Sequence, residues 1–168
     1  MKSMKQNRSD KNEHYDILQS PVGTLYLIIG PSSLIGISFE KPSGIIPRHS
    51  NISATAKKEL EEYFNAERSE FTVETRFAEG SDFEKEVWEA LLDVPYGETR
   101  SYKWIAEKIN RPHAFRAVGN ALGKNPIPII YPCHRVIESD GSIGGYSSGI
   151  DIKRRLLEIE YYTKLSKG

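Results

Sequence analysis

Two hydrophobic patterns follow one another along the chain. Between residues 13 and 40, short apolar runs are separated by turn sequences at 20–23 and 30–33. This pattern predicts an antiparallel meander of three strands, at 15–18, 25–29 and 34–39. Beyond residue 80, apolar residues recur every three or four positions, as in amphipathic helices. We therefore expect an α+β protein with an antiparallel sheet in its N-terminal half and helices in its C-terminal half.

A helix and a further strand complete the predicted N-terminal half. Ser53 is the expected N-cap of a helix that runs to about Asn65 and buries Ala56, Leu60, Tyr63 and Phe64. Residues 41–50 are predicted to form a loop, and residues 71–74 a short strand. Since no residue before position 80 carries recognisable chemistry, we expect a mobile tail at 1–12 and a structural α/β domain at 13–78.

The C-terminal half, residues 79–168, is predicted to be mostly helical. Ser81 and Glu84 have the spacing of a capping box, which opens a helix that ends before Pro95. Short helices at 102–109 and 113–123 are joined by a tight turn, a pattern typical of a helix-turn-helix. A hairpin is expected around the turn at 139–141, and a last helix at 151–161. The apolar residues expected to face the core are Phe83, Val87, Trp88, Leu91, Leu92, Phe115, Val118, Leu122, Ile152, Leu156, Leu157 and Ile159.

Composition excludes several classes of protein. The 168 residues contain one cysteine, so no internal disulfide can form and a reducing compartment is expected. One cysteine and four scattered histidines also argue against a cysteine-rich zinc site, and we expect no metal and no cofactor. No apolar run is long enough to span a membrane, and the polar start does not look like a secretory signal. A cytoplasmic location follows.

Charge is unevenly distributed along the chain. The formal net charge is zero, yet residues 99–155 carry ten Lys and Arg against four Asp and Glu. Within this region Arg116, Asn120 and Lys124 form an i, i+4, i+8 row, flanked by small residues that would let a helix lie close to DNA. An ordinary solvated helix face would give the same pattern.

The single cysteine, Cys133, lies between Pro132 and His134 in an apolar stretch. A soft nucleophile beside a potential base suits alkyl or acyl transfer to sulfur. Adjacent side chains on an extended segment point to opposite faces, so His134 would reach the thiol through a water or from a sharp turn. A lone cysteine that behaves as a small buried hydrophobe is the alternative.

Several motifs occur in consistent order along the C-terminal half, namely Gly97-Glu98-Thr99 with Tyr102, Arg116-Ala117-Val118-Gly119, Asn125-Pro126-Ile127-Pro128, Pro132-Cys133-His134-Arg135-Val136 and Gly144-Gly145-Tyr146-Ser147. Together they closely resemble the motifs of the O6-alkylguanine-DNA alkyltransferases, also called methylated-DNA–protein-cysteine methyltransferases. The resemblance covers about residues 83–160, and the N-terminal half fits loosely the ribonuclease H-like domain that precedes this core in the family. It implies repair by direct reversal: a monomer binds the minor groove of double-stranded DNA, flips out O6-alkylguanine, and keeps the alkyl group in a single turnover. O4-alkylthymine is a second candidate substrate.

The resemblance also implies roles for individual residues. Cys133 would accept the alkyl group, His134 would activate it through a water, and Glu160 would hold His134. Asn125 would brace the active-site turn, and Tyr102 would bind the extruded guanine and help to protonate it. The carbonyl groups of Cys133 and Val136 would accept from the guanine amino group, the Ser147 N–H would donate to O6, and Arg116 would fill the gap in the base stack. The other positions expected to face substrate or DNA are Ala117, Gly119, Asn120, Arg135, Tyr146 and Ser148.

Two features depart from the family pattern, and three rival functions remain open. Residues 112–115 differ from the usual small-residue run, and Ser148 stands where some relatives have glycine, which could narrow the substrate pocket.

The first rival function is a damage-binding protein without alkyl transfer, which the presence of Cys133 disfavours. A redox regulator that binds a promoter and a Cys-His hydrolase are the others. No cysteine-rich segment is present, so transcriptional self-activation is not implied.

Overall fold

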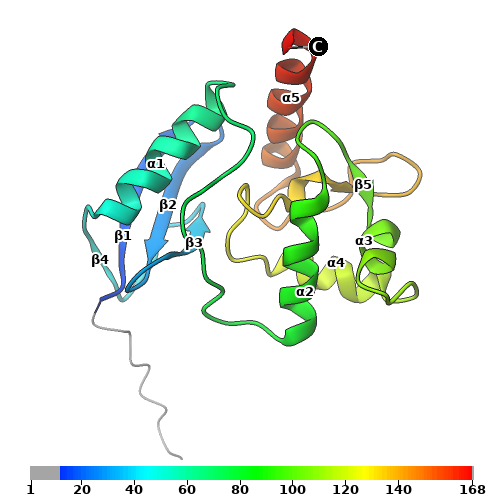
Figure 1. The fold of residues 1–168 in the computed structure, drawn as a ribbon, viewed down its shortest axis with the longest axis horizontal. Coiled ribbons are helices and arrows are strands. Elements are labelled where there is room, and N and C mark those ends of the chain that lie inside the picture. The colour runs from blue at the N-terminus through cyan, green and yellow to red at the C-terminus, as the bar shows by residue number, and fades with distance from the viewer. Residues whose placement is uncertain (1–11, 168) are drawn as a thin grey trace, which may run out of the picture.

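The computed structural model describes residues 12–167 and has a sheet-containing half and a helical half (Figure 1). The predicted tail, 1–12, lies outside the described residues except for Asn12. The N-terminal half contains β1 (His14–Ser20), β2 (Gly23–Ile29), β3 (Leu34–Ser38), β4 (Ile46–Pro47) and α1 (Asn51–Phe64). The C-terminal half contains α2 (Asp82–Ala90), η1 (Leu91–Asp93), β5 (Arg100–Ser101), α3 (Tyr102–Lys108), α4 (Phe115–Gly123), η2 (Cys133–Arg135), β6 (Val136–Ile137) and α5 (Ile150–Lys167), where η denotes a 3-10 helix.

The N-terminal sheet has the strand order β3-β2-β1-β4. The predicted antiparallel meander is confirmed, and β2 buries Leu25, Leu27 and Ile29 on one face. The loop prediction for 41–50 missed β4, which pairs parallel to β1. The strand predicted at 71–74 is wrong, because the buried Glu59 carboxylate accepts the backbone N–H groups of Thr72 and Val73 that a strand would have used.

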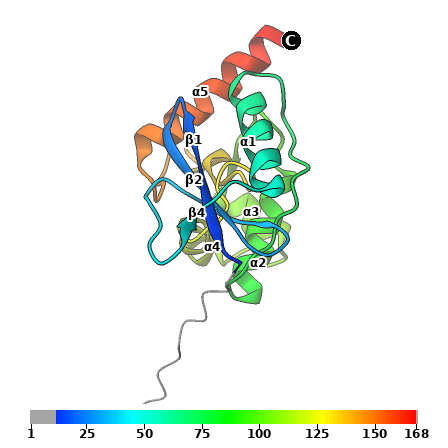
Figure 2. The same cartoon turned by 90° about the vertical axis from the view of Figure 1, so that its left-hand side faces the viewer.

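Helix α1 packs along one face of this sheet (Figure 2). It begins at Asn51, and its N-cap is Ser50 rather than the predicted Ser53. Ser50 accepts from the Ser53 N–H, while the Ser53 hydroxyl accepts from the Ser50 N–H, which forms a reciprocal capping box. Leu60 and Tyr63 on its inner face are fully buried, as expected.

The helical half follows the predicted periodicity with some corrections. The capping box of Ser81 and Glu84 is confirmed at the start of α2. Leu92 is exposed because α2 gives way to the tighter helix η1 at residue 91, and Phe115, at the first position of α4, is 47% exposed and not a core residue. The predicted hairpin is wrong: residues 138–142 form a turn, but β6 pairs parallel with β5.

Helix α5 runs beyond its predicted end at residue 161 and reaches Lys167. Of the four residues expected to be buried on it, Leu156 is buried, whereas Ile152, Leu157 and Ile159 are only partly covered. The inner face instead carries three polar residues, Lys153, Glu160 and Thr163. The buried side of this helix therefore brings charged groups into the protein.

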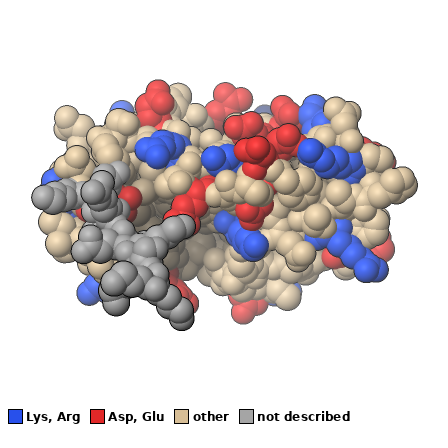
Figure 3. Space-filling view, turned by 90° about the horizontal axis from the view of Figure 1, so that it is seen from below, with Lys and Arg blue, Asp and Glu red and all other residues tan. Residues whose placement is uncertain are grey.

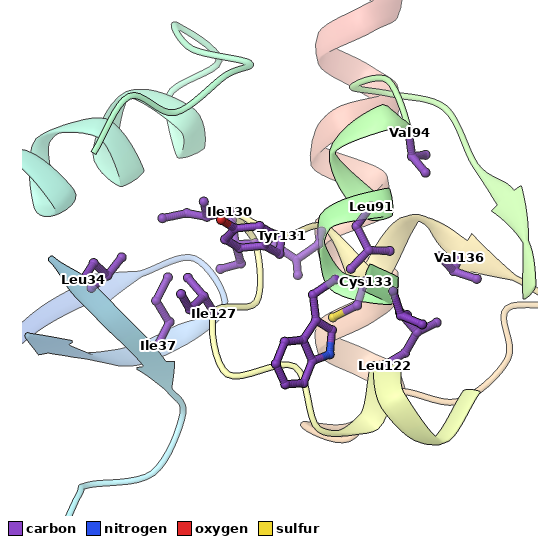
Figure 4. Packing of buried hydrophobic residues seen from close by; sticks show 14 of the residues in the cluster. Leu34, Ile37, Leu91, Val94, Leu122, Ile127, Ile130, Tyr131, Cys133 and Val136 are labelled. Carbon is purple, nitrogen blue, oxygen red and sulfur yellow. The ribbon is translucent and has the colours of Figure 1, made fainter. Parts of the chain in front are cut away.

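The two halves share one continuous hydrophobic core (Figure 4). The free edge of β3 is covered, because Leu34 donates its N–H to the Glu74 carbonyl at 2.9 Å and Ile37 donates to the Pro126 carbonyl at 2.9 Å. The second of these bonds ties the sheet to the segment that leads to Cys133. Within residues 12–167, no helix combines the length and the apolar character that crossing a membrane requires.

Candidate active site

Asn125 braces the segment that leads to Cys133. Its side-chain amide donates to the Tyr131 carbonyl at 2.8 Å, and its side-chain oxygen accepts the Ile127 N–H at 3.0 Å. Between these contacts Ile129 has a φ of 74°, a conformation that β-branched residues rarely adopt. A strained backbone persists only where its surroundings fix it, so the segment is held in one shape.

Cys133 is the first residue of η2 and is 7% exposed. Its N–H donates to the Tyr131 carbonyl at 2.8 Å, and its own carbonyl accepts the Val136 N–H. Burial raises the pKa of the thiol, while Asn125, Tyr146 and Lys153 counteract part of that rise. Within the described part of the chain the Tyr146 hydroxyl makes no hydrogen bond of ordinary geometry, yet it lies close enough to the thiol for each to affect the pKa of the other.

His134 and Glu160 form a fully buried pair. The Nε2 atom of His134 lies 2.5 Å from Oε2 of Glu160, and Nδ1 has no hydrogen-bond partner among the described residues. Burial lowers the pKa of His134 and outweighs the attraction of Glu160, so the ring is neutral at pH 7. Burial alone would raise the pKa of Glu160, but His134 and Arg135 hold it well below its usual range. The ionised Glu160 therefore binds the Nε2 proton and leaves Nδ1 as a free base.

Arg135 was expected to face substrate or DNA, and the structure corrects this. It is 5% exposed, and its Nε and Nη2 atoms donate to the Glu160 carboxylate at 2.8 and 3.2 Å. Its Nη1 atom donates to the Val94 carbonyl at 2.9 Å. Since a buried cation needs a nearby anion, Arg135 supports Glu160 from inside the protein.

Lys153 is a fully buried lysine on α5 that sequence inspection did not single out. Its ammonium donates to the Val136 carbonyl at 2.6 Å and to the Gly145 carbonyl at 3.0 Å. Burial lowers the pKa of Lys153 to about 8, against the attraction of Cys133 and Glu138. Lys153 thus joins the Cys133 segment to the glycine-rich loop and brings a positive charge near the sulfur.

A cavity of about 580 Å³ opens at Cys133. Its lining is mainly apolar and includes Cys133, Tyr102, Arg116, Gly119, Tyr146 and Ser147. Most of the residues that were expected to bind the guanine therefore lie together around one space. This volume falls within the range of pockets that enclose small molecules.

Two glycines leave the space that Tyr102 occupies at this cavity. A Cβ atom at Gly144, whose φ is +71°, would lie 2.8 Å from the Tyr102 hydroxyl oxygen, and one at Gly119 would lie 3.8 Å from the ring. Gly144 therefore tolerates no side chain without a shift of Tyr102. The backbone of the loop and the phenol approach each other directly.

Ser148 does not line this cavity. It lies with Ser147 and Cys133 on a second cavity, of about 870 Å³, which is bounded by β3 and by the segment around Asn125. Replacement of glycine by Ser148 therefore does not narrow the first cavity, contrary to expectation. Cys133 therefore borders both cavities.

Helix α4 presents Arg116, Ala117 and Asn120 to solvent on its exposed side. Among the described residues, Arg116 makes no hydrogen bond or ion pair, although it borders the cavity at Cys133. Val118 and Leu122 anchor the opposite side of the helix in the core. This arrangement positions a free cation at the mouth of the cavity.

Comparisons with known proteins agree with this geometry. The family model for the DNA binding domain of 6-O-methylguanine DNA methyltransferase matches residues 82–162, and the model for the ribonuclease-like domain of the same family matches residues 14–77. A methylated-DNA–protein-cysteine methyltransferase of Methanosarcina barkeri is 44% identical over 88% of this chain and 96% of its own length. The chain belongs to the 6-O-methylguanine DNA methyltransferase family.

Solved structures of the family have the same fold. The O6-methylguanine methyltransferase of Mycobacterium tuberculosis superposes with a TM-score of 0.83 at 45% identity, over 90% of this chain and 94% of that one. A structure of the M. tuberculosis protein in complex with DNA gives a TM-score of 0.82 at 44% identity, over 89% and 94% of the two chains. The expected α+β fold with a ribonuclease-like N-terminal part is confirmed.

Sequence inspection did not identify two residues that contact this candidate site, namely Lys153 and Tyr63. Lys153 shares one helix face with Leu156 and Glu160, at spacings of three and seven residues, and this spacing was a usable signal. Tyr63 donates its hydroxyl to Oε2 of Glu160 at 2.6 Å across 97 positions of sequence. No local pattern predicts a contact of that separation.

Proposed function

We propose that this protein repairs O6-alkylguanine in double-stranded DNA by moving the alkyl group irreversibly onto Cys133. The placement of Cys133 on a cavity large enough to hold a nucleobase, with Arg116 also in its lining, is the observation that carries the proposal. A guanine inside a duplex cannot reach a buried thiol, so the base must first leave the stack. Arg116 then fills the gap that the base leaves.

The chemistry is a displacement at the alkyl carbon. Nδ1 of His134 takes the thiol proton through an intervening water, and the sulfur forms a bond to the alkyl carbon as the bond from that carbon to O6 breaks. The electron pair passes to the guanine, which is protonated with the help of the Tyr102 hydroxyl. Tyr102 remains a proton donor at neutral pH, because burial raises its pKa. The thioether that results has no second nucleophile to remove it, so each molecule reacts once.

Binding of the flipped guanine relies on backbone groups around the cavity. The Val136 carbonyl already accepts from Lys153, and the Cys133 carbonyl accepts from the Val136 N–H. Each carbonyl oxygen keeps a second lone pair for the guanine amino group. The Ser147 N–H is the proposed donor to O6, and Tyr146 forms part of the cavity wall.

We propose that α4 enters the minor groove and that one protein molecule acts alone. The small Ala117 and Gly119 beside Arg116 and Asn120 let the helix backbone approach a groove only about 6 Å wide. The face seen from below in Figure 1 carries Lys and Arg interspersed with Asp and Glu (Figure 3). Shape and the Arg116 wedge, rather than a broad positive field, would therefore direct binding. In this scheme residues 79–168 bind and react, and residues 13–78 support them.

An intact-mass measurement tests the proposed reaction. The protein is incubated with duplex DNA that contains O6-methylguanine and with an undamaged duplex as control. We expect one added methyl group per chain, located on Cys133, and no further product after prolonged incubation. Lesion binding without modification would instead indicate a damage-binding protein, and repeated turnover would indicate a hydrolase.

A further inference from the structure

Glu160 accepts hydrogen bonds from four residues, and one of them comes from the N-terminal half. Its Oε2 atom accepts from His134 at 2.5 Å, from the Tyr63 hydroxyl at 2.6 Å and from Arg135 at 3.2 Å. Its Oε1 atom accepts from Arg135 at 2.8 Å and from the Gly97 N–H at 3.1 Å. Tyr63 and His134 thus share one oxygen atom of the carboxylate.

We propose that Tyr63 is a positioning residue for alkyl transfer: its hydroxyl fixes the Glu160 carboxylate so that His134 stays neutral, with Nδ1 free to take the thiol proton. This inference rests on the proposed function. It gives the N-terminal half a part in the chemistry, beyond structural support.

The Tyr63 hydroxyl can only act as a donor in this network. The residue is fully buried, and burial together with the neighbouring Glu160 raises its pKa well above the usual value. Its ring packs against Phe64, Phe71 and Tyr96, with centroid separations of 5.1, 5.7 and 6.0 Å. Because the ring is held by these contacts, the hydroxyl reaches Glu160 without depending on the hydrogen bond for its orientation.

The shared oxygen links Tyr63 to the proton affinity of His134. The groups that face this network are Glu160 and Lys153 from α5, Arg135 from η2, Tyr63 from α1, and Tyr96 from the segment before β5. Arg135 and Lys153 oppose protonation of His134, whereas Glu160 favours it. A hydrogen bond from Tyr63 spreads the charge of the carboxylate, so Glu160 favours the imidazolium less.

Loss of the hydroxyl should therefore appear as a change in pH dependence. In Tyr63→Phe the carboxylate attracts the His134 proton more strongly, so the pKa of His134 rises. A protonated His134 has no lone pair at Nδ1 and cannot accept the thiol proton. Alkyl transfer should slow on the acidic side and recover where His134 is again neutral.

The experiment measures the rate of transfer from free O6-benzylguanine to the full chain as a function of pH. For Tyr63→Phe we expect the acidic limb to move up by about one pH unit, so that transfer is about tenfold slower at acidic pH where His134 is mostly protonated in both proteins, and within about twofold of the parent near pH 8.5. Ile29→Val, a small cut in the buried core of the N-terminal half, is the control and should keep the parent profile. A Tyr63→Phe profile that superposes on the parent, a rate lowered equally at every pH, or the same shift in Ile29→Val would overturn the proposal.

An NMR titration tests the same link without any alkylated substrate. The chain has four histidines, so the His134 signal can be assigned by substitution of the other three. The pKa of His134 should rise in Tyr63→Phe and stay unchanged in Ile29→Val. An unchanged pKa in Tyr63→Phe would contradict the proposal even if transfer occurs. A parent protein that takes up no alkyl group would refute the proposed function, while the titration would still decide the role of Tyr63.

Discussion

The cavity at Cys133 and the cluster around Glu160 differ in how completely their polar groups are paired. Among residues 12–167, Arg116 at the cavity has no hydrogen-bond or ion-pair partner, and the Tyr146 hydroxyl makes no hydrogen bond of ordinary geometry. Both oxygens of Glu160, in contrast, accept several hydrogen bonds from inside the protein. Arg116 is therefore available to a ligand, while the paired Glu160 carboxylate holds His134 in a fixed orientation before any ligand arrives.

Glu160→Gln should produce the largest effect, because it removes the charge on which the paired cluster depends. A buried Arg135 without its anion should cost about 3–5 kcal/mol in the free energy of unfolding, and alkyl transfer should slow as His134 loses its anchor. Urea unfolding and single-turnover rates measure the two effects. Glu158→Gln, on an exposed part of the same helix, is the matched control and should change neither.

The effect of Glu160→Gln on the free energy of unfolding should depend on pH. Folding lowers the pKa of Glu160, so its contribution is present above the pKa of the unfolded carboxyl, about 4.3, and is lost as the pH falls through the folded value. The unfolding free energies of the parent and Glu160→Gln should therefore converge in acid. A difference that stays constant from neutral to acidic pH would contradict the assignment of the charge.

Arg116→Ala should affect the cavity at Cys133 and leave the cluster around Glu160 unchanged. Without the wedge, repair of a lesion in duplex DNA should slow by about 10- to 100-fold, since base flipping costs a few kcal/mol. Stability should change by no more than about 0.5 kcal/mol, because Arg116 has no partner to lose. Transfer from free O6-benzylguanine, which needs no flipping, is the internal control, and equal losses on both substrates would remove the wedge assignment.

Lys153→Met tests a residue that lies between the cavity at Cys133 and the cluster around Glu160. Loss of the ammonium should raise the pKa of the Cys133 thiol further, so that alkylation by iodoacetamide near pH 7 slows about tenfold. Because the pKa of Lys153 is about 8, the parent loses this charge above that pH and the two rates should converge there. Lys164→Met, an exposed lysine on the same helix, should react like the parent at every pH.

Gly144→Ala should give the smallest effect, which arises from the close approach of the loop to Tyr102. The left-handed backbone and the contact with the hydroxyl should cost about 1 kcal/mol, and displacement of Tyr102 should slow repair modestly. Gly145→Ala meets no atom within 4 Å and serves as the control. Thermal unfolding and duplex repair rates compare the two variants, and equal behaviour would show that Tyr102 does not need this glycine.

Much of the fold could be predicted because its signals are local. The meander follows from turn sequences between apolar runs, and the start of α2 from a capping box four residues long. The errors fell where distant groups compete with local preference. Residues 71–74 are not a strand because Glu59, on α1, takes their backbone donors. Phe115 has helical spacing, but α4 begins at that residue and leaves it at the surface.

The sequence by itself determined the reactive group and the family, because Cys133, His134 and the flanking motifs are adjacent along the chain. Only the tertiary structure decided which groups control them. Arg135 looks like a surface cation in sequence, yet it is buried against Glu160, and Tyr63 reaches the same carboxylate from the other half of the molecule. A charge can be buried only where the fold supplies partners for it, and those partners are brought together from distant parts of the chain.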